Sequence, residues 1–249
     1  PTARPSAAAF PIIRTGAPSV PREQHQLPRR TRSPQQVGEA VDGEPTDVRA
    51  VADRDPATGT GRLTVHATTG EARSDGARVR VLLDGEPVGD SKARWEHPTS
   101  VHANAYLFTG RGATVAAEIP GVAAWSAEQP HLSDLRVELV DADGELLDAV
   151  GLRVGFRRVE VRGHELLVNG RAVLVKGVNR HDHDPRTGKT VSRAAMRRDV
   201  ELMKAHNLNA VRTSHYPNDP YLYDVCDELG MYVVDEANLE THAYLRSLL

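Results

Sequence analysis

Clusters of polar residues follow a series of short apolar runs in the C-terminal part of this chain. They occupy residues 179–183, 212–218, 235–238 and 240–242 and contain histidines, arginines, carboxylates and amides. In a (β/α) barrel, the carboxyl ends of successive parallel strands meet on one face, where catalytic side chains gather. The spacing therefore predicts the start of a barrel with a site built from these clusters. The sequence ends at Leu249, so we expect three of the eight barrel strands.

The segments between these clusters alternate between helical and strand patterns. Ser192 can cap a helix that runs to about residue 206, because apolar residues recur there on one stripe. Residues 209–212 predict a strand, residues 220–229 a second helix, and residues 231–234 a further strand that is apolar on both faces. The expected order is β-α-β-α-β.

An earlier part of the chain has the pattern of a β-sandwich. Short alternating runs at 62–67, 78–83, 113–117 and 135–140 are separated by glycine-containing turn signals. About 100 residues with strands spaced in this way are typical of an immunoglobulin-like sandwich. Nothing in these strands has the pattern of a catalytic constellation.

These patterns predict a multidomain β plus α/β chain with three parts. Residues 1–45 are rich in Pro, Arg, Ser and Gln and are expected to form either a disordered arm or the remnant of a removed segment. Residues 46–154 form the sandwich, and residues 155–249 form the incomplete TIM barrel. A hairpin opens the barrel part, with strands at 165–168 and 172–175 around an Asn-Gly turn.

The bulk composition excludes several classes of partner. A net charge of −3 with interspersed acidic and basic residues gives no basic surface for nucleic acid or anionic lipid. No apolar run approaches the roughly 18 residues that a membrane helix needs. The single cysteine, Cys226, cannot form an internal disulfide, which is consistent with a reducing compartment and a cytoplasmic location.

The motifs on these elements closely resemble β-galactosidases of glycoside hydrolase family 2. A stretch further upstream resembles the end of that family's first immunoglobulin-like domain. The sequence differs from the family pattern at Ser133, where an aromatic residue is expected, and after residue 242. The matching segments are residues 125–132, 154–157, 169–170, 176–181, 209–218 and 235–242.

The resemblance implies roles for six residues. His181 and His215 match histidines that line the galactose pocket and stabilise the transition state through sugar hydroxyls. Arg212 and Glu236 match polar groups at the pocket floor, where a substrate contact and a structural ion pair are equally compatible with the sequence. Magnesium ligands are implied at two further positions, Glu240 and His242.

The same resemblance places both catalytic carboxyl groups on later barrel strands, beyond residue 249. A retaining glycosidase needs an acid/base and a nucleophile about 5–5.5 Å apart, so we expect these 249 residues alone to be inactive. The resemblance also implies that the full-length protein is a homo-oligomer. Three alternatives stay open: a β-glucuronidase-type sister activity, a complementing fragment or sugar-binding remnant without catalysis, and a degraded or frameshifted reading frame.

Overall fold

The computed structural model describes residues 45–69, 76–95 and 111–238. The arm expected over residues 1–45 lies outside these ranges except for Pro45, which begins the first strand. Glu240 and His242, the expected magnesium ligands, also lie outside the described residues.

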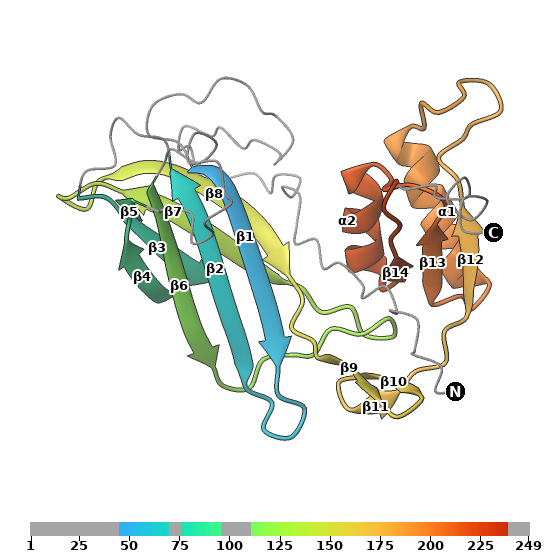
Figure 1. The fold of residues 1–249 in the computed structure, drawn as a ribbon, viewed down its shortest axis with the longest axis horizontal. Coiled ribbons are helices and arrows are strands. Elements are labelled where there is room, and N and C mark those ends of the chain that lie inside the picture. Colours follow the sequence, from blue (N-terminus) through green and yellow to red (C-terminus); the bar gives the residue numbers. More distant parts are fainter. Residues whose placement is uncertain (1–44, 70–75, 96–110, 239–249) are drawn as a thin grey trace, which may run out of the picture.

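The first part of the fold is a pair of antiparallel four-stranded sheets, shown on the left of Figure 1. One sheet has the order β1-β2-β6-β5 and the other β4-β3-β7-β8. Their strands are β1 (Pro45–Arg54), β2 (Gly61–Thr69), β3 (Arg78–Leu83), β4 (Glu86–Lys92), β5 (Arg94–Trp95), β6 (Arg111–Ile119), β7 (Ser133–Val140) and β8 (Leu146–Val154).

The core of this sandwich lies between its two sheets because the strands alternate apolar and polar residues. In β2 every second side chain is buried, and Leu63, Val65 and Ala67 point inward. Val79 and Val81 of β3 meet them from the opposite sheet in the same buried cluster. The period of two thus sets which face of each strand is buried.

A small antiparallel sheet, β11-β10-β9, joins the sandwich to the second part of the fold. It contains β9 (Val159–Arg162), β10 (Glu165–Val168) and β11 (Arg171–Ala172). Asn169 and Gly170 both have positive φ, 52° and 78°, as the expected type I′ turn requires.

The second hairpin strand is shorter than predicted: β11 ends at Ala172, and one more hairpin hydrogen bond follows, from the Val173 N–H to the Leu166 carbonyl at 2.9 Å. Beyond that bond, the backbone is held by Asn209. Its side-chain amide accepts from the Lys176 backbone N–H at 2.7 Å and donates to the Leu174 carbonyl at 3.0 Å. These two bonds replace the strand pairing that the apolar pattern suggested.

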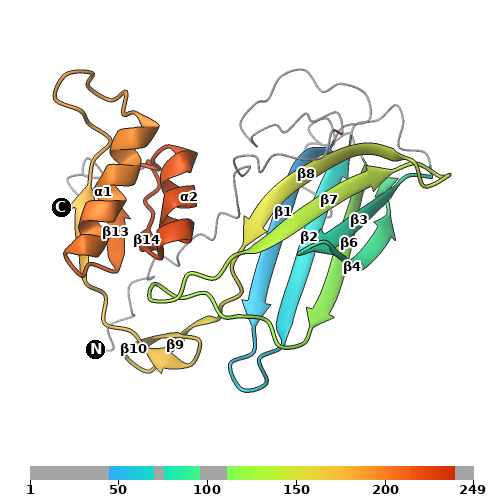
Figure 2. The ribbon, with the colours of Figure 1, turned by 180° about the vertical axis from the view of Figure 1, so that it is seen from behind.

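The second part of the fold has the predicted β-α-β-α-β order. A parallel sheet contains β12 (Gly177–Arg180), β13 (Ala210–Thr213) and β14 (Tyr232–Val234) in sequence order. The helices α1 (Arg193–Ala205) and α2 (Pro220–Leu229) connect these strands and pack beside each other, as the reverse view in Figure 2 shows.

Both helices begin and end where the sequence predicts. Ser192 caps α1 by accepting the Ala195 N–H at 3.2 Å. Asp219 caps α2, where Pro220 occupies the first helical position and Gly230 ends the helix in the left-handed conformation at φ 78°. A terminal glycine with this φ satisfies carbonyls that the helix would leave free.

The parallel sheet leaves apolar side chains exposed. Val178 of β12 is 39% exposed, and Val234 of β14, the strand expected to be apolar on both faces, is 40% exposed. Buried apolar residues of α1, α2 and β13 form one cluster, so the helices cover one face of the sheet. Within the described residues nothing covers the other face, which in a closed barrel is the interior.

A loop after β6 fixes the sandwich to the barrel part. The Trp125 indole is 2% exposed, donates to the Asp227 carbonyl at 2.8 Å and meets the Tyr232 ring edge-on at 5.8 Å between centroids. Lys204 Nζ donates to the carbonyls of Ala127 at 2.7 Å and Gly230 at 2.8 Å. Hydrogen bonds and aromatic packing therefore hold the two parts in one orientation.

Two oppositely charged groups are partly buried in this junction. The Arg157 guanidinium lies 4.6 Å from the centre of the Trp125 ring, and burial lowers its pKa. Burial also raises the pKa of Asp227 to about 7, against the attraction of Arg157 and with the repulsion of Asp224. Desolvation is the larger effect because the neutral carboxyl loses less hydration on burial.

Candidate active site

The parallel sheet brings the predicted polar clusters to one edge. Asn179 is paired with Arg212 and Arg180 with Thr213, while Val234, two residues before Glu236, is paired with Arg212. The clusters begin within the last residues of β12 and β13 rather than strictly after them. Their side chains therefore start from rigid strand backbone at the carboxyl ends.

His181 and His215 lie side by side at this edge. Their ring centroids are 5.7 Å apart and their planes nearly perpendicular at 88°. His181 Nδ1 contacts the Ser214 carbonyl oxygen, which can only accept, so Nδ1 donates and Nε2 of the neutral ring is left as an acceptor. The peptide bond between Ser214 and His215 is cis. Both imidazoles are exposed, so they can reach a bound ligand.

Arg212 and Glu236 form the ion pair that the sequence left as one of two alternatives. Arg212 Nε and Nη2 lie 2.8 Å and 2.5 Å from Glu236 Oε1, and Nη1 donates to Asn179 Oδ1 at 3.2 Å. His215 Nδ1 lies 3.3 Å from Glu236 Oε2. Each Glu236 oxygen thus has its own basic neighbour, and the carboxylate joins Arg212 to the second histidine.

Arg180 holds the end of β12 through three side-chain partners. It is 6% exposed, and its guanidinium donates to Asp199 of α1 at 3.0 Å, to Asp182 at 2.5 Å and to Asn218 at 2.7 Å. Its Nη2 atom has no hydrogen-bond partner among the described residues. The residue joins β12, α1 and the segment after β13, and sequence reasoning assigned it no role.

A second polar network, also missed from the sequence, joins the ends of β13 and β14. Asp235 Oδ1 accepts from Thr213 Oγ1 at 2.6 Å and from the Tyr223 hydroxyl at 2.7 Å. That hydroxyl in turn accepts from the Asn218 N–H at 2.8 Å. A carboxylate directly after an apolar strand and a threonine at the end of the neighbouring strand were the only signals of this network in the sequence.

The described residues offer no ready metal centre. In residues 45–69, 76–95 and 111–238, no group of three or more His, Cys, Asp and Glu side chains is arranged to hold a metal ion. Asp235 and Glu236 already accept hydrogen bonds from neighbouring side chains. Neither helix in this part of the chain has the length and apolar character that crossing a membrane requires.

Two family models match successive parts of the chain. Residues 45–157 match the model described as glycosyl hydrolases family 2, and residues 159–248 match the TIM barrel domain of the same family. The chain belongs to glycosyl hydrolase family 2. The sandwich described above falls within the first match, and the parallel β-α-β-α-β unit falls within the second.

Relatives of this family 2 chain include two bacterial β-galactosidases. The chain is 46% identical over 166 residues to a β-galactosidase of Vibrio cholerae, covering 67% of this chain and 15% of the relative. Over 118 residues it is 56% identical to a β-galactosidase of Pectobacterium atrosepticum, covering 47% of this chain and 11% of the relative. The chain therefore spans a small part of the length of these relatives.

A solved structure of the same architecture is the β-glucuronidase of Bifidobacterium dentium, complexed with coumarin-3-O-glucuronide. It superposes with a TM-score of 0.66 at 25% sequence identity, covering 79% of this chain and 31% of that structure. The sandwich and the barrel unit of this family 2 chain thus have a counterpart of known structure.

Proposed function

We propose that this family 2 chain forms part of a retaining β-galactosidase, an enzyme that hydrolyses terminal β-D-galactosides. The observation that carries the proposal is the placement of His181, His215, Arg212 and Glu236 together at the carboxyl edge of the parallel sheet. The 46–56% identity to β-galactosidases supports the choice of substrate.

In this proposal the two histidines bind sugar hydroxyls in the transition state. The His181 Nδ1 contact to the Ser214 carbonyl fixes the ring orientation and leaves Nε2 for the sugar. Arg212 holds Glu236, and Glu236 holds His215 through its other oxygen. Groups fixed before substrate arrives lose little free energy in reorganisation when charge develops.

The acid/base and the nucleophile come from elsewhere in this proposal. The described carboxylates at the edge, Asp182, Asp235 and Glu236, are held by neighbouring side chains. The family resemblance assigns the two catalytic carboxyls to later barrel strands. We therefore propose that residues 1–249 alone are inactive and contribute part of the galactose pocket.

The remaining features of the proposal follow from the family resemblance and the composition. Residues 46–154 form an immunoglobulin-like domain, which the β1-β2-β6-β5 and β4-β3-β7-β8 strand orders support. Residues 155–249 begin the TIM barrel, and Glu240 and His242 bind Mg²⁺ as a structural aid to the pocket. The enzyme is cytoplasmic and homo-oligomeric, with no nucleic-acid or membrane partner.

A β-glucuronidase activity is the second candidate, because a β-glucuronidase shares the fold. The complete enzyme carrying these residues should be assayed with 2-nitrophenyl β-galactoside and the matching glucuronide. We expect the galactoside to be preferred, and His215→Phe to lower its kcat/KM by about 100-fold or more, as loss of one transition-state hydrogen bond does. A preference for the glucuronide would contradict the proposal.

A matched control keeps that assay specific. His164→Phe changes an exposed histidine in the turn between β9 and β10, away from the candidate site. Its kcat/KM should stay within twofold of the unaltered enzyme. An equal loss in both variants would assign the effect to folding rather than to the pocket.

A further inference from the structure

A cavity of about 700 Å³ lies at the junction of the sandwich, the hairpin sheet and the parallel sheet. Its walls include Ser126 and Glu128 of the loop after β6, Asn169 and Arg171 of the hairpin, and Tyr232 of β14. Lys176 and Asn209, which precede β12 and β13, also line it. The cavity therefore opens at the amino ends of the parallel strands, opposite the candidate active site.

The framework of this cavity is held by internal hydrogen bonds. Asn169 Nδ2 donates to the Trp125 carbonyl at 3.0 Å, and its Oδ1 accepts from the Arg158 N–H at 3.0 Å. Asn209 likewise bonds to the backbone: its Oδ1 accepts from the Lys176 N–H and its Nδ2 donates to the Leu174 carbonyl. These amides are already paired, so they fix the shape of the cavity and leave recognition to other side chains.

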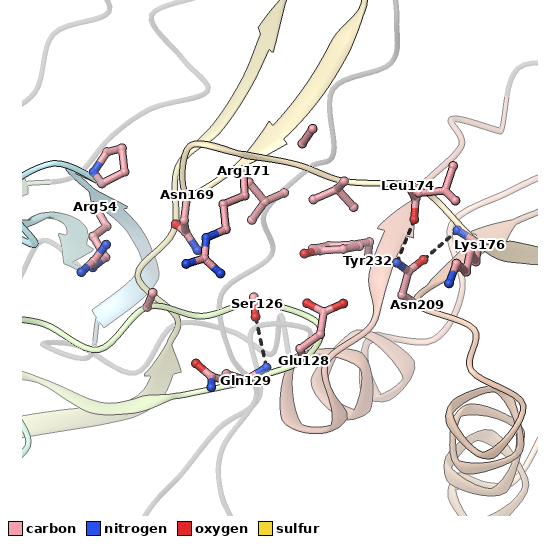
Figure 3. Close-up of a pocket in the computed structure, with 15 residues that line it drawn as sticks. Arg54, Ser126, Glu128, Gln129, Asn169, Arg171, Leu174, Lys176, Asn209 and Tyr232 are labelled. Carbon is pink, nitrogen blue, oxygen red and sulfur yellow. Dashed lines mark hydrogen bonds between the residues drawn. The ribbon is translucent and has the colours of Figure 1, made fainter.

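Three cationic side chains, those of Arg54, Arg171 and Lys176, line the cavity, and Glu128 contributes one carboxylate to the same lining. Arg54 is anchored through Nε, which donates to the Val122 carbonyl at 3.1 Å. Neither Arg171 nor Lys176 has an ion-pair or hydrogen-bond partner for its side chain among the described residues, and the same holds for Glu128. In Figure 3, Arg171 lies on one side of the Tyr232 ring and Lys176 on the other.

We propose that this cavity is a second binding site, for a small saccharide that carries a carboxylate. The volume lies within the roughly 300–1,000 Å³ typical of small-molecule sites, which occur preferentially at domain junctions. Guanidinium groups bind a planar carboxylate through paired hydrogen bonds. Glu128 accepts from sugar hydroxyls, and the Ser126 hydroxyl, whose oxygen already accepts the Gln129 N–H at 3.1 Å, donates to them. The Glu128 charge repels a doubly charged phosphate more strongly than a singly charged carboxylate.

The test is calorimetric titration of the 249-residue chain with galacturonate, galactose 6-phosphate and neutral galactose. Ionic strength should be low, because salt screens exposed charges. We expect galacturonate to bind at least tenfold more tightly than galactose and more tightly than galactose 6-phosphate. Equal affinity for the acid and the neutral sugar, or no binding of galacturonate, would overturn the proposal. Tighter binding of the phosphate would overturn the assignment to a carboxylate.

Paired variants locate the site. Arg171→Gln removes a cavity cation on an exposed position and should weaken galacturonate binding at least tenfold. Arg162→Gln removes an arginine from β9 of the same hairpin sheet, with its side chain 73% exposed and outside the cavity lining, and should leave binding unchanged. Circular dichroism verifies that both variants fold.

Loss of binding in His181→Ala, with Arg171→Gln unaffected, would instead assign galacturonate to the candidate active site and overturn the proposal. The readout is binding rather than hydrolysis. Its outcome is therefore distinguishable from a failure of the proposed galactosidase activity.

Discussion

At the scale of single residues, Arg180 holds together three segments next to the candidate site. Its guanidinium is 5% exposed and contacts Asp182, which is 13% exposed, and Asp199. Arg180→Met should lower the free energy of unfolding by about 3–5 kcal/mol, because it leaves the largely shielded Asp182 carboxylate and the buried Asn218 oxygen without their cation. Urea denaturation measures the change.

The control for this variant is Arg162→Met, since that side chain is 73% exposed and lies 3.8 Å from Glu160. An exposed pair of this kind contributes about 0–1 kcal/mol. If both variants lost the same stability, the role assigned to the Arg180 network would be wrong.

Asp227 gives a residue-scale prediction for pH. Its pKa in the folded chain is about 7, above the ordinary value of 3.8, so the folded state binds the proton more tightly than the unfolded state. The contribution of Asp227 to stability is therefore greatest below about pH 4, falls as pH rises towards 7 and is constant above that. Asp227→Asn should remove this slope and stabilise the chain at pH 8.

The measurement is the unfolding free energy of the original chain minus that of Asp227→Asn, followed from pH 4 to pH 8. A flat difference over this range would show that the junction does not perturb this carboxyl.

At the scale of elements, Gly230 couples the end of α2 to the loop after β6. Its φ is 78°, and an added Cβ would overlap the Ala127 carbonyl oxygen. Gly230→Ala should therefore cost the roughly 1–2 kcal/mol of left-handed backbone and about 1–3 kcal/mol more for the overlap. Thermal unfolding reports the sum.

Gly121→Ala isolates the backbone part of that cost. Gly121 has φ 68°, and an added Cβ would meet no atom within 4 Å. Equal destabilisation in the two variants would mean that the loop moves aside without loss and that the contact at Gly230 is unimportant.

The helices and strands also show how much of the fold could be predicted from the sequence. Capping residues and apolar periodicity are local, so α1 and α2 were predicted almost to the residue. The Asn209 side chain shortened the hairpin through bonds to residues more than 30 positions away. The Arg180–Asn218 and Thr213–Asp235 bonds likewise join positions 38 and 22 apart. Such pairs depend on strand register, which a single sequence does not specify.

The candidate site was predicted to a similar extent. Strand-end clustering and the family resemblance identified His181, His215, Arg212 and Glu236, and the structure brings all four to one edge. Their catalytic roles stay predictions. The sequence could not distinguish an ion pair from a substrate contact at Arg212, because that depends on the side-chain geometry across neighbouring strands.

At the scale of the whole molecule, the sandwich and the barrel unit differ in how completely they are covered. The sandwich has apolar side chains from two sheets around one core, whereas the parallel sheet leaves Val178 and Val234 about 40% exposed. We expect amides of residues 177–238 to exchange hydrogen faster than those of the sandwich strands, because less burial favours local opening.

Hydrogen exchange of residues 1–249, measured by mass spectrometry on a sample of known oligomeric state, tests this expectation. The sandwich strands β2, β3 and β7 serve as the internal reference. Slow and uniform exchange across both parts in a monomer would contradict it, and would mean that α1, α2 and the junction suffice to stabilise the open sheet.

The junction between the two parts also bears on how freely its residues can be replaced. Trp125 and Lys204 are its side-chain donors, while the acceptors at Asp227, Ala127 and Gly230 are all main-chain carbonyls. Every amino acid carries that carbonyl, but few can supply an indole N–H or an ammonium group at these positions. These hydrogen bonds are therefore sensitive to replacement on the donor side only: a substitution at Trp125 or Lys204 removes them, whereas one at Asp227 or Ala127 keeps the carbonyl. At Ala127, which is 1% exposed, the limit on replacement is side-chain size instead.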